Sequence, residues 1–187
     1  MASSSPHIDL SRYDNSDYDP GPSWLRALWY VVSIFVFEIE IPWPNSMKSA
    51  ILRFFGGQVG DGVVLKPRLH IKYPWFLHIG DHAWIGEKVW IDNVAPVTIS
   101  ENACLSQGVC VFSGNHDRNS VSFDLRLEPV TIENGAWLAA KSIVCPGTHV
   151  GSHAMLTAGA VAKGTLDAFG IYEGNPALRV GTREICD

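Results

Sequence analysis

His116 is the residue whose type and position most clearly suit a catalytic role. It stands in the run Gly114-Asn115-His116-Asp117, directly before a long interruption of an otherwise regular sequence, residues 117–131. Loops held on a rigid scaffold are where functional side chains tend to lie. A histidine side chain titrates near neutral pH, so it can take a proton from a hydroxyl or an amine that attacks a carbonyl carbon. The sequence therefore predicts His116 as a general base, supported by its neighbours Asp117 and Asn115.

Such a base needs an acceptor oxygen that fixes the tautomer of its ring. Asp117 is the adjacent carboxylate, but the sequence leaves open whether this side chain or a carbonyl oxygen takes that role. A serine or cysteine nucleophile is disfavoured. Ser113 lies three residues before His116 without a G-x-S-x-G turn, and Cys110 and Cys145 have no base within their own motif.

The other histidines and the cysteines form no recognisable metal site, so we expect no metal. Two histidine pairs have the i, i+4 spacing that suits a helix, but they fall in segments that read as β-structure: His149 with His153, and His78 with His82. The cysteines contain no C-x-x-C pair and are interpreted as buried, reduced thiols of a cytosolic protein: Cys104, Cys110, Cys145 and Cys186.

The scaffold that must position His116 is a six-residue repeat that begins at Val59. Of fifteen positions in this series, fourteen are Val, Ile or Leu. The positions are Val59, Leu65, Ile71, Ile79, Ile85, Ile91, Ile99, Leu105, Val111, Ile132, Leu138, Val144, Val150, Leu156 and Ala162. A small or β-branched residue usually follows four positions later. A helix would scatter this pattern around its axis, whereas short strands joined by sharp corners place both series in one core.

Three such hexads make one triangular coil of 18 residues, and stacked coils pair their backbones in parallel. The sequence predicts about five coils: 59–76, 79–96, 99–116, 132–149 and 150–167, with residues 117–131 as an insertion and 168–187 as a tail. The glycine and asparagine residues are expected to supply the unusual dihedral angles at the corners. Because a short solenoid exposes flat apolar faces and open ends, we expect a cap and homo-oligomerisation.

Residues 1–58 precede the repeat and are predicted to form an arm and a cap. Residues 1–23 are polar and rich in turn formers, which is typical of an extended, partly ordered arm. Residues 24–41 are strongly apolar but too short to span a bilayer, so they could form a buried helix, an interfacial segment or a subunit contact. An amphipathic segment, 47–55, follows and stops at two glycines.

The overall charge argues against nucleic acid as a partner, and the N-terminal sequence favours a cytoplasmic location. The net charge is −5, which disfavours nucleic-acid binding as a main activity. The first residues lack the positive and apolar regions of a secretory signal, so we expect a cytoplasmic protein. Peripheral membrane contact through the apolar segment stays open but is not favoured.

The chain resembles the hexapeptide-repeat acyltransferases, and within them the O-acetyltransferases encoded in exopolysaccharide clusters, of the colanic-acid type. The similarity runs nearly end to end. It includes DLSRYDNSDYDPG (9–21), KYPW (72–75), IGDHAWIGEKVWIDNVAPVTI (79–99), FSGNHD (112–117), the FDL tripeptide (123–125), IENGAWLAAKSIVCPG (132–147) and EGNPA (173–177).

This resemblance implies an all-β, left-handed parallel β-helix that assembles as a homotrimer. It implies acetyl-CoA as cosubstrate, held in the groove between neighbouring subunits, and direct transfer of the acetyl group to an acceptor that His116 deprotonates. The acceptor would be a saccharide or another small molecule with a hydroxyl or an amine, in polysaccharide biosynthesis. Asp92 and Asn93 would face that acceptor.

The same resemblance implies a set of cofactor-binding residues. Trp137, Ala139 and Ala140 would line the pantetheine channel, with Ala158 and Gly159 near the cofactor one coil above. The adenine and phosphate end would lie near Asn175, Pro176 and Arg179. Lys163 is a weaker candidate for the phosphates, because relatives place lysine one position later in this segment.

Two readings compete with this one. A zinc carbonic anhydrase on the same fold needs three converging histidines, and the chain has Ser120, Val121 and Ser122 where a second ligand would stand. A non-catalytic repeat scaffold would need neither the SGNHD run nor a cofactor groove. Metal analysis and thermal stabilisation by acetyl-CoA, respectively, would separate these two from the acetyltransferase.

Overall fold

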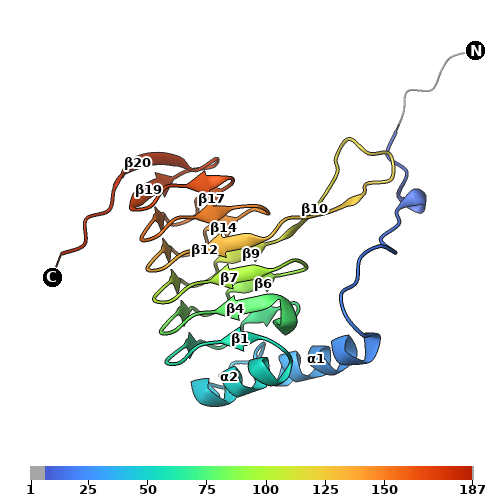
Figure 1. The fold of residues 1–187 in the computed structure, drawn as a ribbon, viewed down its shortest axis with the longest axis horizontal. Helices are drawn as coiled ribbons and strands as arrows, with labels where there is room; N and C mark the ends of the chain where they lie inside the picture. The colour runs from blue at the N-terminus through green and yellow to red at the C-terminus, as the bar shows by residue number, and fades with distance from the viewer. Residues whose placement is uncertain (1–6, 187) are drawn as a thin grey trace, which may run out of the picture.

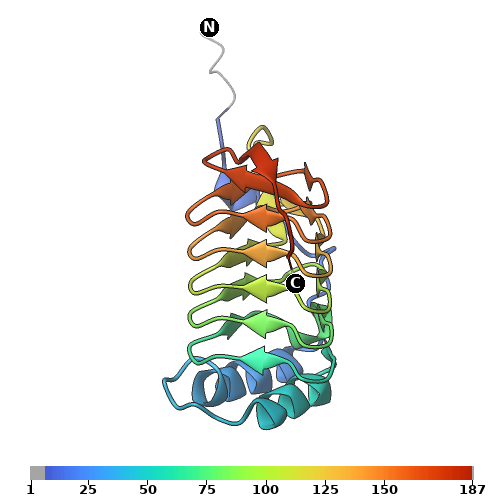
Figure 2. The same ribbon diagram turned by 90° about the vertical axis from the view of Figure 1, so that its left-hand side faces the viewer.

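The six-residue repeat builds a parallel β-helix of three sheets, seen from two sides in Figures 1 and 2. The computed structural model describes residues 7–186. Sheet A contains, in spatial order, β1 (Gln58–Val59), β4 (Leu77–Ile79), β7 (Val97–Ile99), β12 (Val130–Ile132), β15 (His149–Val150) and β18 (Thr165–Leu166). Sheet B contains β2 (Val64–Leu65), β5 (Trp84–Ile85), β8 (Cys104–Leu105), β13 (Trp137–Leu138), β16 (Met155–Leu156), β19 (Gly170–Glu173) and β20 (Leu178–Thr182). Sheet C contains β3 (His70–Ile71), β6 (Trp90–Asp92), β9 (Cys110–Phe112), β14 (Ile143–Val144) and β17 (Val161–Ala162).

The repeated aliphatic side chains fill the interior, as the sequence predicts. Residues in the same slot of successive coils lie in register, such as Ile79 with Ile99 and Leu105 with Leu138. These side chains are fully buried, and the smaller residues of the second series, such as Ala103, share the core with them. Burying one Leu or Ile side chain contributes roughly 1.5–3 kcal/mol, so a column of them stabilises the stack strongly.

The outer surfaces of the three sheets differ in character. Sheet A presents polar side chains: Gln58, His78, Thr98, Thr131, His149 and Thr165. Sheet B presents an apolar column: Val64, Trp84, Cys104, Trp137, Met155 and Ile171. Sheet C presents His70, Trp90, Cys110, Ile143 and Val161. Two of the three sheets thus carry apolar side chains on both faces.

The corners correct part of the prediction about glycine. Several corners do use glycine or asparagine at positive φ, such as Gly62 and Asn102, but His82 and Lys141 adopt the same conformation at φ 57° and 59°. The glycines that follow the core aliphatic residues instead allow the backbones of successive coils to approach each other closely. A Cβ on Gly80 would lie 2.4 Å from the backbone nitrogen of Glu101 in the next coil. Glycine is required there because the coils stack too tightly for a side chain.

Two helices close the first coil, α1 (Ser23–Val36) and α2 (Asn45–Phe54) (Figure 2). The indole N–H of Trp29 donates to the carbonyl oxygen of Ile71 at 2.9 Å, and the buried Lys48 ammonium donates to that of Leu65. Burial lowers the pKa of Lys48. The two helices therefore satisfy carbonyls at the open end of the solenoid and cover its core.

Only one side of α1 packs on the coil. Trp29 and Ser33 are its buried residues, whereas Trp24, Tyr30 and Phe35 are each about two-thirds exposed, at 67%, 66% and 65%. The buried-helix interpretation of residues 24–41 therefore holds for one face only. Within residues 7–186, no helix is long and apolar enough to cross a membrane.

The boundaries of the insertion and of the tail differ from prediction. The chain leaves the stack at Gly114 and forms a hairpin from β10 (Gly114–His116) and β11 (Leu125–Leu127), then rejoins at Val130 (Figure 1). Beyond residue 167 the stack continues, because β19 pairs with β16 and β20 pairs back on β19. Two 3-10 helices complete the described elements, η1 (Leu10–Arg12) in the arm and η2 (Pro74–Phe76) after β3.

Candidate active site

The hairpin carries His116 away from the coils, at the edge where sheet C turns into sheet A. His116 pairs with Leu125 across the two strands of the hairpin. The arm, residues 7–22, runs beside the hairpin: the N–H of Asp9 donates to the carbonyl oxygen of Val121 at 2.8 Å, and the Tyr18 hydroxyl donates to that of Val94 at 2.6 Å. These contacts fix an insertion that would otherwise project freely. Residues 1–6 of the predicted arm lie outside the described residues.

The ring of His116 is held by a backbone carbonyl and by two aromatic rings. Its Nδ1 lies 2.9 Å from the carbonyl oxygen of Phe123. The rings of His116 and Phe123 are stacked, with centroids 4.2 Å apart and an angle of 8° between their planes. The centroid of the Tyr13 ring lies 5.6 Å from that of His116. Because a carbonyl oxygen only accepts hydrogen bonds, Nδ1 carries the proton in the neutral ring. Nε2 is then the unprotonated nitrogen, which is the state that a general base needs.

Asp117 does not orient this ring, which corrects one part of the sequence-based prediction. Its carboxylate accepts hydrogen bonds from the backbone N–H of Asn119, at 2.9 Å, and from the Arg126 guanidinium. These two donors hold the pKa of the Asp117 carboxyl below its ordinary value. The Asn115 side chain accepts from the backbone N–H of His116 at 2.8 Å. Both residues therefore shape the hairpin, and the Phe123 carbonyl takes the role considered for Asp117.

A polar hollow of about 390 Å³ lies beside the hairpin, and His116 is one of its lining residues. Lys163, Cys145 and Pro146 line it from the upper coils, and Arg118 and Arg126 line it from the hairpin. Burial raises the pKa of the Cys145 thiol, so this side chain stays protonated and is a poor nucleophile. The hollow thus combines His116 with three cationic side chains and two carboxylates, Asp117 and Glu128, and the Arg126 guanidinium is already paired with Asp117.

The residues predicted to contact the pantetheine lie at the opposite edge of sheet C, where sheet B turns into it. Trp137 is in β13 of sheet B, and its indole N–H donates to the Ser106 hydroxyl at 3.0 Å. At the corner above, the Gly159 N–H donates to the carbonyl oxygen of Ala140 at 3.0 Å, so small residues of successive coils stack there. Ala139 is buried at this corner, and Ala158 is exposed. None of these residues lines the hollow of His116.

The segment that includes Asn175, Pro176 and Arg179 lies above that same small-residue corner. The N–H of Val161 donates to the carbonyl oxygen of Gly174, and the N–H of Ala177 donates to that of Val161, both at 2.9 Å. Arg179 is exposed and donates to the Thr182 hydroxyl at 3.2 Å. The structure thus groups these predicted residues with Ala140 and Gly159, while it places Lys163 with His116.

Of the two predicted acceptor-facing residues, one is partly exposed and one is fully buried. Asp92 ends β6 on the outer side of sheet C, opposite Phe112 of the next coil. Asn93 is fully buried. Its side chain accepts from the backbone N–H groups of Lys72 and Tyr73, each at 3.1 Å, and donates to the Tyr73 carbonyl oxygen. Asn93 therefore satisfies backbone groups at a corner and has no free group for an acceptor, which corrects that prediction.

Sequence reasoning missed the two aromatic residues that pack against the ring of His116. Tyr13 and Phe123 both fall in segments that carry the family resemblance, the DLSRYDNSDYDPG run and the FDL tripeptide. The resemblance marked the segments without giving them a role: the contact of Tyr13 joins the arm to the hairpin, and that of Phe123 depends on how the hairpin folds back on itself. The i, i+4 histidines have separate partners, as expected: His149 pairs with Glu133 at 3.0 Å, and His153 packs against Phe169.

The sequence of this chain is similar to those of known acetyltransferases. The chain is 31% identical, over 156 residues, to the putative colanic acid biosynthesis acetyltransferase WcaF of Escherichia coli K12, covering 83% of this chain and 86% of that protein. It is 22% identical over 160 residues to the galactoside O-acetyltransferase of the same organism, covering 82% and 76%. No family model matches.

Solved structures share the fold at lower identity. A hexapeptide-repeat acetyltransferase of Vibrio cholerae, complexed with acetyl coenzyme A, superposes with a TM-score of 0.79 at 19% identity, covering 89% of this chain and 93% of that one. A maltose O-acetyltransferase of Clostridium difficile 630 gives 0.79 at 20% identity, covering 88% and 90%. The repeat, the fold and the similarity to the colanic-acid protein over 83% of the chain agree, and they favour neither a carbonic anhydrase nor a scaffold. This chain belongs to the hexapeptide-repeat acyltransferases, in the group of the colanic-acid biosynthesis acetyltransferases, and is itself an acetyltransferase.

Proposed function

We propose that the protein transfers the acetyl group of acetyl-CoA directly to a hydroxyl of a saccharide acceptor, with His116 as general base. The observation that carries this proposal is the hydrogen bond from His116 Nδ1 to the Phe123 carbonyl oxygen at 2.9 Å. That bond leaves Nε2 free to accept the hydroxyl proton. Donor and acceptor class are supported by the relatives, one solved with acetyl coenzyme A and others named as O-acetyltransferases of galactosides and maltose.

The reaction proceeds by attack of the acceptor oxygen on the thioester carbonyl carbon while Nε2 takes the hydroxyl proton. A carbon–oxygen bond forms, the carbon–sulfur bond breaks, and the coenzyme A thiolate takes the proton back from the imidazolium. The products are the acetyl ester and free coenzyme A. No covalent acyl-enzyme is required, which agrees with the raised pKa of the half-buried Cys145 thiol.

We propose that the active enzyme is a homotrimer of left-handed β-helices. In one chain, His116 lies at one edge of sheet C and the predicted pantetheine residues lie at the other. A second subunit that brings its Trp137, Ala140 and Gly159 toward His116 would complete the site. The apolar outer columns of sheets B and C support such packing, because exposed Trp84 and Trp90 gain a cover in the assembly.

The remaining residue roles follow from this arrangement. Trp137, Ala139, Ala140, Ala158 and Gly159 contact the pantetheine, and Asn175, Pro176, Arg179 and Lys163 lie toward the nucleotide end. Asp92 faces the acceptor from one coil below the hairpin. Residues 1–58 act as arm and cap for the catalytic domain, 59–187. A cytoplasmic location is supported by the four cysteines, all free thiols.

Replacing His116 by alanine tests the central role. We expect turnover, measured as release of coenzyme A thiol with a saccharide panel, to fall by about 10²–10⁴-fold. Binding of acetyl-CoA, measured as thermal stabilisation, should be unchanged. The matched control is His78→Ala, which removes an exposed histidine from the outer side of sheet A. Wild-type turnover by His116→Ala would overturn the assignment of the base, and absence of any effect of acetyl-CoA on stability would overturn the choice of donor.

A further inference from the structure

The two helices that close the first coil turn their charged side chains toward it. They form a layer at one end of the column (Figures 1 and 2). Residues 23–57, which contain both helices, include five charged residues. Two of these donate to carbonyl oxygens of the first coil: the buried Lys48 to that of Leu65, and Arg53 Nε to that of Val59 at 2.7 Å. These two cations therefore hold the layer against the coil.

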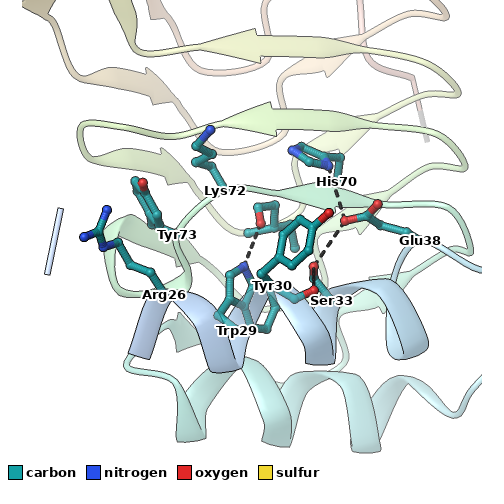
Figure 3. Close-up of a pocket in the computed structure, with 9 residues that line it drawn as sticks. Arg26, Trp29, Tyr30, Ser33, Glu38, His70, Lys72 and Tyr73 are labelled. Atoms are coloured by element: carbon teal, nitrogen blue, oxygen red, sulfur yellow. Dashed lines mark hydrogen bonds and ion pairs between the residues drawn. The ribbon is translucent and has the colours of Figure 1, made fainter. Parts of the chain in front are cut away.

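The other three charged residues of the layer also lie toward the coil. Glu38 lies 3.4 Å from His70 Nδ1, as Figure 3 shows, and Glu40 pairs with Arg68. Arg26 lines a hollow of about 280 Å³ between α1 and the coil, and its Nε is buried. The side of α1 that faces away from the coil is therefore left without a charged side chain.

That outer side of α1 is a continuous apolar stripe. Its members stand at the positions i, i+4, i+7 and i+11, which share one side of a helix, and each is between 45% and 67% exposed: Trp24, Leu28, Val31 and Phe35. Trp29, which bonds to the coil, falls on the opposite side. An exposed apolar surface of this extent indicates a contact with something other than water.

The stripe has tryptophan at both ends. Trp24 lies in the first turn of α1, and Trp43 follows the helix, with its indole N–H donating to the carbonyl oxygen of Phe35 at 3.2 Å. Tryptophan prefers the boundary between the headgroups and the acyl chains of a bilayer. The 14 residues of α1 extend only about 21 Å, so the helix would lie along such a boundary rather than cross it.

The same end of the molecule is its basic end. Residues 22–76 contain six lysine and arginine residues against three carboxylates, a net charge of +3 in a chain whose total is −5. Lys66 and Lys72 are exposed at the corners that follow β2 and β3, and like Arg26 they form no ion pair within residues 7–186. Cations beside an apolar layer attract anionic headgroups, while the acidic remainder of the chain is repelled.

The proposed homotrimer leaves this end of the column uncovered. Its subunits pack side by side through sheets B and C, and the helices close the end of each column. His116 follows the third coil and Trp137 lies in the fourth, so neighbours that share a site stand at nearly the same height. The three apolar layers then lie at the same end, where one flat surface can contact all of them.

We propose that the apolar side of α1 binds the surface of a lipid bilayer, and that Arg26, Lys66 and Lys72 select an anionic one. A protein partner fits this stripe less well, because the stripe offers no charged or hydrogen-bonding group to fix the partner's register. A bilayer needs no register, and it matches both the apolar stripe and the cations beside it. This inference goes beyond the transfer reaction and does not depend on the role of His116.

The test measures flotation of the full-length protein with vesicles of phosphatidylcholine, alone or with about 30 mol% phosphatidylglycerol. We expect binding to the anionic vesicles to be at least about tenfold tighter than to the neutral ones. Trp24→Ser/Phe35→Ser should weaken binding to the anionic vesicles by at least about tenfold, because two apolar side chains no longer enter the bilayer. Ile185→Ser is the matched control, since Ile185 is 58% exposed but lies beyond the last strand.

The contribution of the cations is measured separately. Lys66→Gln/Lys72→Gln should lower the preference for anionic vesicles by about tenfold and leave binding to the neutral vesicles unchanged. Lys141→Gln is the control for loss of a positive charge. Lys141 is exposed at the same kind of corner as Lys66, three coil spacings or about 15 Å farther from the helices, which exceeds the screening length in 0.1 M salt.

Three results would overturn the proposal. The first is the absence of binding to both kinds of vesicle, and the second is equal binding by the wild type and Trp24→Ser/Phe35→Ser. The third is a complex of two trimers in lipid-free buffer that this variant dissociates, because the stripe would then bind a second copy. If the double variant melts at a lower temperature, Phe35→Glu replaces it, with the same loss of binding expected. His116→Ala should bind vesicles as the wild type does, so lipid binding and turnover are tested independently.

Discussion

The two edges of sheet C are built on opposite principles. At the edge that leads to sheet A, the chain leaves the stack, and a hairpin holds His116 between the rings of Phe123 and Tyr13. At the edge that comes from sheet B, the chain never leaves the stack, and small residues such as Ala140 and Gly159 follow one another from coil to coil. Under the proposed function, the comparison teaches that proton transfer depends on particular side chains, whereas donor binding depends on backbone groups and on the absence of side chains.

The largest effect that we expect comes from mixing two variants that are each impaired in a different part of the proposed site. His116→Ala removes the base, and Trp137→Glu should raise the apparent KM for acetyl-CoA by placing a charge in the pantetheine channel. If each site takes His116 from one subunit and Trp137 from the next, a one-to-one mixture of subunits regains activity in about a quarter of its sites, because each partner is intact half of the time.

The measurement is coenzyme A release, below the KM, by co-expressed variants compared with each variant alone. Thr98→Glu serves as the control for an added charge, since Thr98 lies on the polar outer side of sheet A, away from the apolar columns of the proposed subunit contact. No recovery in the mixture would mean that both edges of one chain serve the same site. An unchanged KM in Trp137→Glu would remove this residue from the channel.

A smaller effect is expected from Phe123→Ala, which removes the ring stacked on His116 but keeps the backbone carbonyl. A ring that is free to turn spends less time in the productive orientation, so kcat should fall by about 10- to 100-fold with little change in the KM for acetyl-CoA. Phe169→Ala is a matched control, because Phe169 packs against His153, with centroids 4.8 Å apart, far along the chain from the hairpin. Equal losses in both variants would indicate general destabilisation instead.

The smallest effect is expected from Asp117→Asn. Asp117 bonds to Arg126 and to the backbone of Asn119, not to the imidazole, so kcat should fall by no more than about fivefold. Its pKa is held below the ordinary value of 3.8, so the ionised pair contributes to folding above that value and is lost as the pH falls through the lower pKa of the folded state. The Asn119 amide resonance should therefore titrate with a midpoint below 3.8 in the wild type and not in Asp117→Asn. A loss of turnover as large as that of His116→Ala would restore Asp117 as the orienting group.

The sequence predicts the scaffold well because the scaffold follows from a short pattern of core residues that repeats every six positions. Each core position, such as Ile99 or Leu105, stands in a slot that recurs along the chain, so an error at one position is corrected by the others. The site is less predictable because its contacts occur once. The carbonyl oxygen that accepts from His116 belongs to the backbone of Phe123. Every residue has such an oxygen, so the residue types in the sequence do not reveal this contact. The resemblance implied that Asn93 faces the acceptor, yet its side chain is hydrogen-bonded to the backbone of Lys72 and Tyr73.

The tight stacking at positions such as Gly80 has a consequence for how this enzyme handles its substrates. Successive coils are joined by continuous ladders on all three sides and approach too closely for even a methyl group at such corners. A column of this kind has no hinge, so it cannot close over a bound molecule as two-domain enzymes do. Any adjustment to a substrate must come from the hairpin and the arm beside it. The rest of the molecule must bind its substrates with a surface whose shape is already set when the chain folds.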